Sequence, residues 1–113
     1  MAGYRGGMGG AQGMQNLMKQ AQKMQEEMRE TEALLDDWEI VGTAGGEAVV
    51  VYMNAKKKID GIEIDKSVID PEDEEMLEDL ILAAINDGYK KADEVYKEKM
   101  APYGAMGGMG GLL

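Results

Sequence analysis

Residues 14–38 read MQNLMKQAQKMQEEMRETEALLDDW, and this stretch decides the fold. Apolar and small residues recur in it at alternating intervals of three and four positions, which is the heptad pattern of a helix with one narrow apolar seam. We therefore expect a helix of about six turns, from Met14 to about Asp37. Such a long stripe must pack on something equally long, so the pattern also predicts a second helix that covers it. The seam residues are Met14, Leu17, Ala21, Met24, Met28, Thr31, Leu35 and Trp38.

The middle of the chain predicts β-strands, because β-branched residues concentrate there and glycines interrupt the pattern. Hairpin turns are expected at Gly45-Gly46 and at Asn54-Ala55, which gives a three-stranded antiparallel meander. The unbroken run Val49–Val51 indicates that the second strand is the central one. The expected strands are Glu39–Thr43, Glu47–Met53 and Lys58–Asp65.

A second long helix is predicted from the segment that follows Asp70. Asp70 fits the N-cap position and Pro71 the first helical position, and acidic residues after them oppose the helix dipole. Apolar residues then keep helical spacing to about Met100, after which Pro102 ends the helix. Gly88 inside this helix costs about 1 kcal/mol relative to Ala, so it marks either a close contact or a weak point.

The order helix, three strands, helix makes this an α+β protein with an α-β-β-β-α protomer. Two long helices leave more apolar surface than one three-stranded sheet can cover, so we expect a homodimer. Both ends of the chain are Gly/Met-rich and bury too little surface to offset the entropy of ordering them. The expected organisation is a flexible tail at 1–13, a structured domain at 14–101 and a second flexible tail at 102–113.

Composition limits the functions that are open to this chain. It has 113 residues and contains neither Cys nor His, which excludes thiol chemistry and removes the commonest general base. We therefore expect no enzymatic activity, no small-molecule substrate, no cofactor and no metal. The acidic run Glu72–Asp79 lacks the glycine and the alternating ligands of a calcium loop. No apolar run approaches the roughly 20 residues of a membrane span, and no secretory signal is evident, so we expect a cytoplasmic protein without a membrane partner.

The charge balance argues against a nucleic-acid partner when it is taken alone. The net charge is −10, of which residues 1–58 carry −1 and residues 59–113 carry −9. Nucleic-acid-binding domains usually show a basic balance or at least a basic face. A binding surface for DNA would have to be local.

Three parts of the sequence resemble the YbaB/EbfC family of nucleoid-associated proteins. They are NLMKQAQKMQEEM at 16–28, Gly45-Gly46, and DPEDEEMLEDLILAAIND at 70–87, and the resemblance spans about residues 14–100. It implies a tweezer-shaped homodimer that is joined through its sheets. It also implies that this homodimer is located in the nucleoid and binds double-stranded DNA with its helical arms. This chain departs from the family where Asn54-Ala55 and three lysines stand in place of the usual Asn-Gly turn.

Carried over by position, the resemblance places the DNA-binding surface on the polar side of the first helix and near the end of the second. With Met14 at heptad position a, Lys19 falls at f, Lys23 at c and Arg29 at b, so all three point away from the seam. The lysines of the second helix lie among acids such as Asp87, which weakens their field. The predicted DNA-binding residues are Lys19, Gln20, Gln22, Lys23, Arg29, Lys90, Lys91 and Lys97, with Lys99 nearby.

Interpretations of the same residues that involve no DNA binding stay open at this point. The cations of the first helix could form a solvated face with i,i+4 pairs such as Lys23 with Glu27. The lysines at 56–58 could be a soluble edge that blocks strand pairing. The alternative function is a protein-interaction adaptor that uses the acidic second helix and the Met-rich tails.

Overall fold

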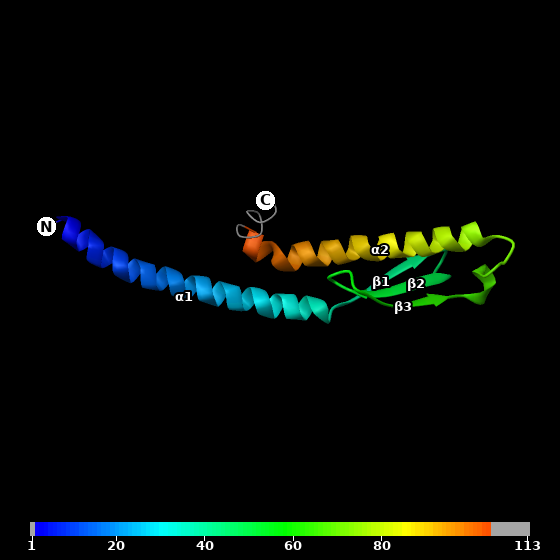
Figure 1. The fold of residues 1–113 in the computed structure, drawn as a ribbon, viewed down its shortest axis with the longest axis horizontal. Coiled ribbons are helices and arrows are strands. Elements are labelled where there is room, and N and C mark those ends of the chain that lie inside the picture. Colours follow the sequence, from blue (N-terminus) through cyan, green and yellow to red (C-terminus); the bar gives the residue numbers. More distant parts are fainter. Residues whose placement is uncertain (1, 105–113) are drawn as a thin grey trace.

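The structure is a computed structural model that describes residues 2–104, with side chains from residue 12 onward. It has the α+β fold and the element order that the sequence predicts (Figure 1). The molecule is elongated, with principal extents of 86 × 24 × 16 Å, because the first helix continues well past the rest of the protomer. In the described part of the chain, no helix is both long and apolar enough to cross a membrane. The elements are α1 (Ala2–Asp36), β1 (Glu39–Ala44), β2 (Val49–Asn54), β3 (Ile59–Ile64), the 3₁₀ turn η1 (Lys66–Val68), α2 (Glu74–Met100) and the 3₁₀ turn η2 (Ala101–Tyr103).

The first helix starts earlier than predicted, and buried residues extend slightly past residue 101. α1 begins at Ala2 rather than at Met14, although the segment before Met14 is rich in glycine. At the other end Tyr103 is buried, so packing continues beyond residue 101. The expected flexibility of residues 1–13 stays a prediction, and most of the predicted second tail, residues 105–113, lies outside the described residues.

The sheet has the order β1-β2-β3 with antiparallel neighbours, so β2 is central as predicted. The first hairpin turns at Gly45 and Gly46, which both have positive φ angles that suit glycine. In the second hairpin the left-handed position is taken by Lys57, with φ 70°. The Asn54 side chain holds that turn, because its Oδ1 accepts the backbone N–H groups of Lys56 and Lys58 at 2.9 Å.

The packing of α2 on the sheet depends on small residues. Ala84, Gly88 and Ala92 recur every four residues and are buried on one face of the helix. A Cβ added at Gly42 of β1 would lie 2.5 Å from the backbone N of Gly88 and would also collide with the carbonyl oxygen of Ala84. The Met53 side chain lies against Gly88 from the neighbouring strand. Gly88 therefore marks a close contact and not a weak point.

The predicted start of the second helix is wrong by one turn. α2 is capped by Asp73, whose carboxylate accepts the N–H of Met76 at 3.2 Å. Asp70 instead forms a separate turn, in which its side chain accepts the N–H of Glu72 at 2.9 Å. Both aspartates precede acidic residues, so local sequence suits either position. The predicted end at Met100 is confirmed.

The prediction that a second helix covers the whole α1 seam is also wrong. The small-residue face of α2 packs on β1 and β2, and α2 ends beside Thr31, whose hydroxyl lies 3.5 Å from that of Tyr103. Leu35 is fully buried at the covered end of the seam, whereas Met14 and Leu17 are 66% and 65% exposed. Within the described part of the protomer, the seam before Met28 is therefore left open.

Candidate nucleic-acid interface

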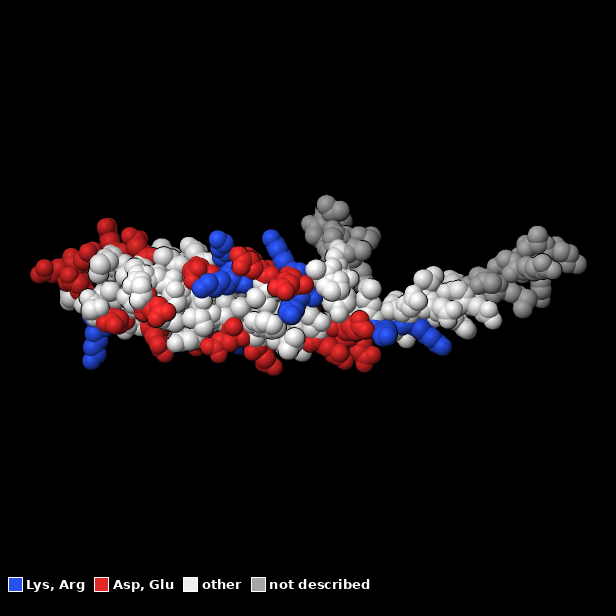
Figure 2. Space-filling view, turned by 180° about the vertical axis from the view of Figure 1, so that it is seen from behind, with Lys and Arg blue, Asp and Glu red and all other residues white. Residues whose placement is uncertain are grey.

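The projecting part of α1 has no acidic residue from residue 12 to residue 25, and its acids begin at Glu26. Between residues 12 and 25 the charged side chains are Lys19 and Lys23, and there is no Asp or Glu. Both lysines are exposed, and so are Gln20 and Gln22 next to them. Figure 2 shows basic side chains on this projection, followed outward by uncharged surface. We call residues 12–25 the α1 arm.

The helix aligns the two lysines of the α1 arm. Residues four apart lie on the same face of an α-helix, with Cβ atoms about 5–6 Å apart. Lys19 and Lys23 have this spacing, and the heptad puts them on the side opposite to Leu17 and the other seam residues. Their ammonium groups can therefore meet adjacent phosphates while the seam stays clear of them.

Neither lysine of the α1 arm forms an ion pair with another described residue. Residues 12–104 form three ion pairs, and none of them uses a cation of α1. The alternative pair of Lys23 with Glu27 is absent among these described residues. Arg29 is also without an ion pair there, but it stands between Glu26, Glu30 and Glu32, so its local field is weaker.

The lysines of α2 have more varied surroundings. Lys91 forms an ion pair with Asp87 at 2.9 Å and donates a hydrogen bond to the carbonyl of Val41 at 3.1 Å, so it fastens α2 to β1. Lys90 and Lys97 are exposed and take part in no ion pair within residues 12–104. The predicted site thus divides into two groups, because Lys19 lies about 18 Å along α1 from Thr31, where α2 ends.

Asp87 holds the junction between α2 and β1. Its carboxylate accepts the backbone N–H of Thr43 at 2.9 Å and pairs with Lys91. The Thr43 hydrogen bond and then the Lys91 ammonium lower the pKa of Asp87 below its ordinary value. This pKa was not foreseen from the sequence, because the partner strand lies 44 positions away.

Replacing Asp87 with Asn is expected to lower stability at neutral pH and to have little effect at low pH. A carboxyl whose pKa is lower in the folded state than in the unfolded state stabilises the protein above its unfolded pKa of about 3.9, and this stabilisation disappears as pH falls through the folded pKa. Urea unfolding of both proteins at pH 7 and near pH 3 measures the difference. An equal loss of stability at both pH values would contradict this role for the Asp87 charge.

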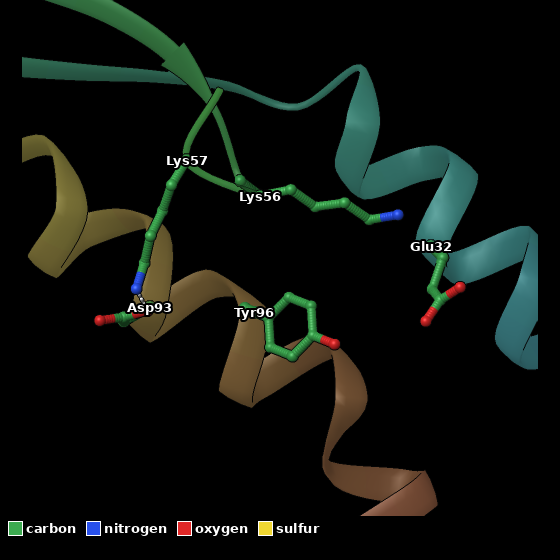
Figure 3. A pocket seen from close by; sticks show the side chains of 6 residues that line it. Glu32, Lys56, Lys57, Asp93 and Tyr96 are labelled. Carbon is green, nitrogen blue, oxygen red and sulfur yellow. Dashed lines mark ion pairs between the residues drawn. The ribbon is translucent and has the colours of Figure 1, made fainter. Parts of the chain in front are cut away.

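The lysines of the second hairpin turn are used to fix that turn between the helices. Lys57 pairs with Asp93 of α2 at 2.7 Å and lies over the Tyr89 ring at 5.6 Å, while Lys56 pairs with Asp36 of α1 at 3.2 Å. Figure 3 shows the two lysines leaving the same turn in different directions, Lys57 toward α2 and Lys56 toward α1. The interpretation of this cluster as a soluble edge leaves out what Lys56 and Lys57 do, because each pairs with a carboxylate of a helix.

A small cleft opens where α1 and α2 diverge around this turn (Figure 3). It is lined by Glu32, Ala55, Lys56, Lys57, Asp93 and Tyr96. Its two lysines are balanced by two carboxylates, so it attracts neither anions nor cations strongly. In the described residues no cluster of three or more acidic side chains has the geometry to hold a metal ion.

Acidic charge gathers at the opposite end of the molecule from the α1 arm. Residues 70–79 at the start of α2 supply most of it, and Figure 2 shows this end densely acidic. The global charge of −10 is therefore spread unevenly along the long axis, with most of the excess acid at the end away from the α1 arm (Figure 2). The only stretch of the described helices with two cations and no acid over more than three turns is the α1 arm.

A family model described as the YbaB/EbfC DNA-binding family matches residues 8–109. The chain belongs to the YbaB/EbfC DNA-binding family. A nucleoid-associated protein of Alkaliphilus metalliredigens is 49% identical over 94 residues, which cover 83% of this chain and 82% of the relative. A nucleoid-associated protein of Clostridium novyi is 52% identical over the same shares. Among solved structures, the uncharacterized protein HP0035 from Helicobacter pylori matches with a TM-score of 0.65 at 29% identity, over 73% of this chain and 86% of that one.

These comparisons confirm the YbaB/EbfC resemblance and give no support to the adaptor alternative. One property of this YbaB/EbfC chain was present in the sequence but overlooked, namely the absence of acids from residues 12–25. Dividing the charge into halves of the chain averaged the arm with the acidic residues that follow Gln25. Net charge summed over a sliding window of about four helical turns would have revealed this stretch.

Proposed function

We propose that this YbaB/EbfC protein is a nucleoid-associated protein that binds duplex DNA, largely through phosphate contacts made by the α1 arm. The observation that carries the proposal is that Lys19 and Lys23 share one exposed helical face, form no ion pair among residues 12–104 and have no acid within the arm. Phosphate contacts of this kind give affinity with little dependence on sequence. Gln20 and Gln22 beside them are able to reach base edges and add modest preference.

The global charge of −10 does not prevent this. The Debye length is about 8 Å at physiological salt, so exposed charges farther apart than this are largely screened. Glu26, the first acid after the arm, lies about 10 Å from Lys19 and about 4.5 Å from Lys23 along the helix axis, so Lys19 is largely screened from it whereas Lys23 is partly opposed by it. The acids at the start of α2 are at the far end of the molecule (Figure 2). DNA that approaches the α1 arm therefore meets a locally positive surface.

The other predicted contacts are proposed with smaller contributions. Arg29 stands among glutamates, and Lys91 is already bound to Asp87 and Val41. Lys90 and Lys97 are exposed on α2 and are free to meet the flank of a duplex that passes beyond the arm. No catalytic step forms part of this proposal.

We also propose that two copies associate through their sheets, as the family resemblance implies. Ile62 pairs with Val51 across the ladder and Ile59 with Met53, so these isoleucines share the apolar face on which α2 packs. α2 lies over β1 and β2 and leaves Ile62 45% and Ile59 37% exposed on β3. β3 is also an edge strand, and an edge with a bare apolar face favours pairing with a second copy.

Replacing Ile62 with Asp is expected to convert the dimer to a monomer at micromolar concentration, because it places a charge in the apolar face proposed to be shared. Sedimentation equilibrium measures the mass. The matched control is Leu82 replaced with Asp, because Leu82 is also an exposed apolar residue, at 58%, but is displaced from the buried face of α2 by about half a turn. Dissociation by both substitutions, or by neither, would contradict dimerisation through β3.

A salt titration of binding to duplex DNA tests the proposed function. Four phosphates, contacted by Lys19 and Lys23 of two protomers, give a slope of log affinity against log salt of about −3.6, and two further contacts by Arg29 bring it to about −5. Mobility shifts at a series of salt concentrations measure this slope. Absence of any shift at tens of micromolar protein in low salt would exclude the proposal.

A further inference from the structure

The open seam of the α1 arm is apolar on the face opposite to its lysines. Met14 and Leu17 are about two-thirds exposed, Met24 is 38% exposed, and Ala21 between them is exposed as well. Met18 flanks this stripe and is 61% exposed. An exposed heptad stripe of this kind is typical of a surface on which another apolar surface packs.

We infer that the α1 arm pairs with the α1 arm of a second copy in an antiparallel coiled coil, and that this pairing links two DNA-bound dimers. The inference rests on the proposed DNA binding and adds bridging to it. A seam of the same length and period fits this stripe, and the chain itself supplies one. The period of 3.5 residues from Met14 to Met24 fits knobs-into-holes packing between two helices.

The protomer determines the direction and the register of the pair. α2 and Tyr103 close the seam from Thr31 onward, so a partner helix can occupy only the stretch before Met28. The antiparallel register that uses this stretch places Met14 against the partner's Met24, and Leu17 against the partner's Ala21. Large side chains then face small or flexible ones at each layer.

Charge favours the same arrangement. In this register the positions that flank the seam bring Met18 opposite the partner's Met18 and Gln20 opposite the partner's Gln20, so no like charges meet. Lys19 and Lys23 stay on the outer side of both helices. The paired arms therefore present lysines on two opposite surfaces, and each surface can hold a separate duplex.

The pair is expected to be weak in free protein and to form on DNA. Its seam spans only about two heptads. Two helices that pack over so short a length bury less surface than the roughly 1,200 Å² typical of a stable interface. Dimers bound side by side on DNA have a much higher local concentration, which turns weak contacts into a stable assembly. Bridging should therefore appear only when two duplexes and enough protein are present.

Cysteine cross-linking tests the register, because the natural chain has no cysteine. Two single variants, Met14→Cys and Met24→Cys, are mixed on DNA and oxidised. A disulfide between the two different variants is expected, with few like-with-like disulfides. The matched control mixes Gln12→Cys with Glu26→Cys, which occupy the same axial level on the outer side of the helices and should not cross-link. Like-with-like products for Met14→Cys as the main species would overturn the antiparallel pair.

Capture of a labelled duplex by a bead-bound duplex tests the function of the seam. The double variant Leu17→Gln/Met24→Gln keeps good helix formers on the exposed arm and leaves Lys19 and Lys23 in place. It is expected to bind a single duplex with unchanged affinity and to lose at least about 90% of the capture. Unchanged capture would overturn the inference while leaving the proposed function intact, whereas loss of single-duplex binding by the natural chain would remove the proposed function itself.

A third variant distinguishes the second copy from other occupants of the seam. Deletion of residues 105–113 removes the apolar Met106, Met109 and Leu112 but leaves both α1 arms complete. Capture by this truncated chain is expected to equal that of the full chain. Loss of capture on truncation, with the seam cross-link also lost, would show that the C-terminal segment is required and would overturn pairing by the two arms alone.

Discussion

Replacing Lys19 and Lys23 together with Ala is expected to weaken binding to duplex DNA by at least about 100-fold at 50 mM salt. In a dimer the double substitution removes four of the proposed phosphate contacts, and each contact contributes about 0.9 to the salt slope through counterion release. The slope should therefore become shallower by about 3.6. Both lysines are exposed on α1 and are absent from the ion pairs of the described residues, so their loss leaves the core unchanged.

The matched control removes the same charge from positions outside the α1 arm. Lys58 and Lys66 are also exposed, and Lys66 stands among the acids that precede α2. The double variant Lys58→Ala/Lys66→Ala has the same net charge as Lys19→Ala/Lys23→Ala, but its salt slope should stay within about 1 of the natural protein. If the two double variants weaken binding equally, total charge governs affinity and the α1 arm is not the binding surface.

Replacing Gly42 with Ala is expected to destabilise the fold by at least about 3 kcal/mol and to lower the melting temperature by at least about 12 °C. The new methyl group would lie 2.8 Å from Cα and 2.5 Å from the backbone N of Gly88, and would collide with the carbonyl of Ala84. These are backbone atoms of a helix, which cannot move aside as a flexible side chain can. α2 would have to lift from β1, and the Asp87 contact with Thr43 would be lost with it.

Gly61 provides the control for Gly42. It also lies in a strand, but a Cβ there would meet only Tyr52 Cδ2, at an ordinary 3.9 Å. Gly61→Ala should therefore change the free energy of unfolding by less than about 1 kcal/mol. Any increase would come partly from the lower conformational entropy of the unfolded chain. Thermal unfolding of both variants at one fixed protein concentration makes the comparison. Similar melting temperatures for the two would show that α2 does not approach β1 as closely as described.

The order of the elements could be predicted because each has its own local pattern. The period of 3.5 in residues 14–38 gives way to β-branched runs broken by Gly45 and Gly46, and helical spacing returns after Asp70. The seam's partner could not be predicted, because helical spacing does not say whether α2 packs on α1 or on the sheet. The start of α2 could not be fixed either, since Asp70 and Asp73 both suit an N-cap.

The site was predictable where it depends on one helix and not where it depends on contacts distant in sequence. The heptad places Lys19 and Lys23 on a common outer face, and the structure keeps both exposed. Lys91 looked equivalent in the sequence, yet it is held by a carbonyl 50 positions away. Lys57 is similarly held by Asp93 across the fold. Only the tertiary structure separates cations that are available to DNA from those that already serve the protein.

The projection of α1 past the end of α2 also sets how the molecule responds to heat. An isolated helix of this length is marginal in water, since it lacks the packing that supports most protein helices. Far-ultraviolet ellipticity should therefore decline gradually on warming before the sheet and α2 unfold together in one steep transition. A bound polyanion that neutralises the two lysines would shift the gradual decline to higher temperature and leave the midpoint of the steep transition nearly unchanged.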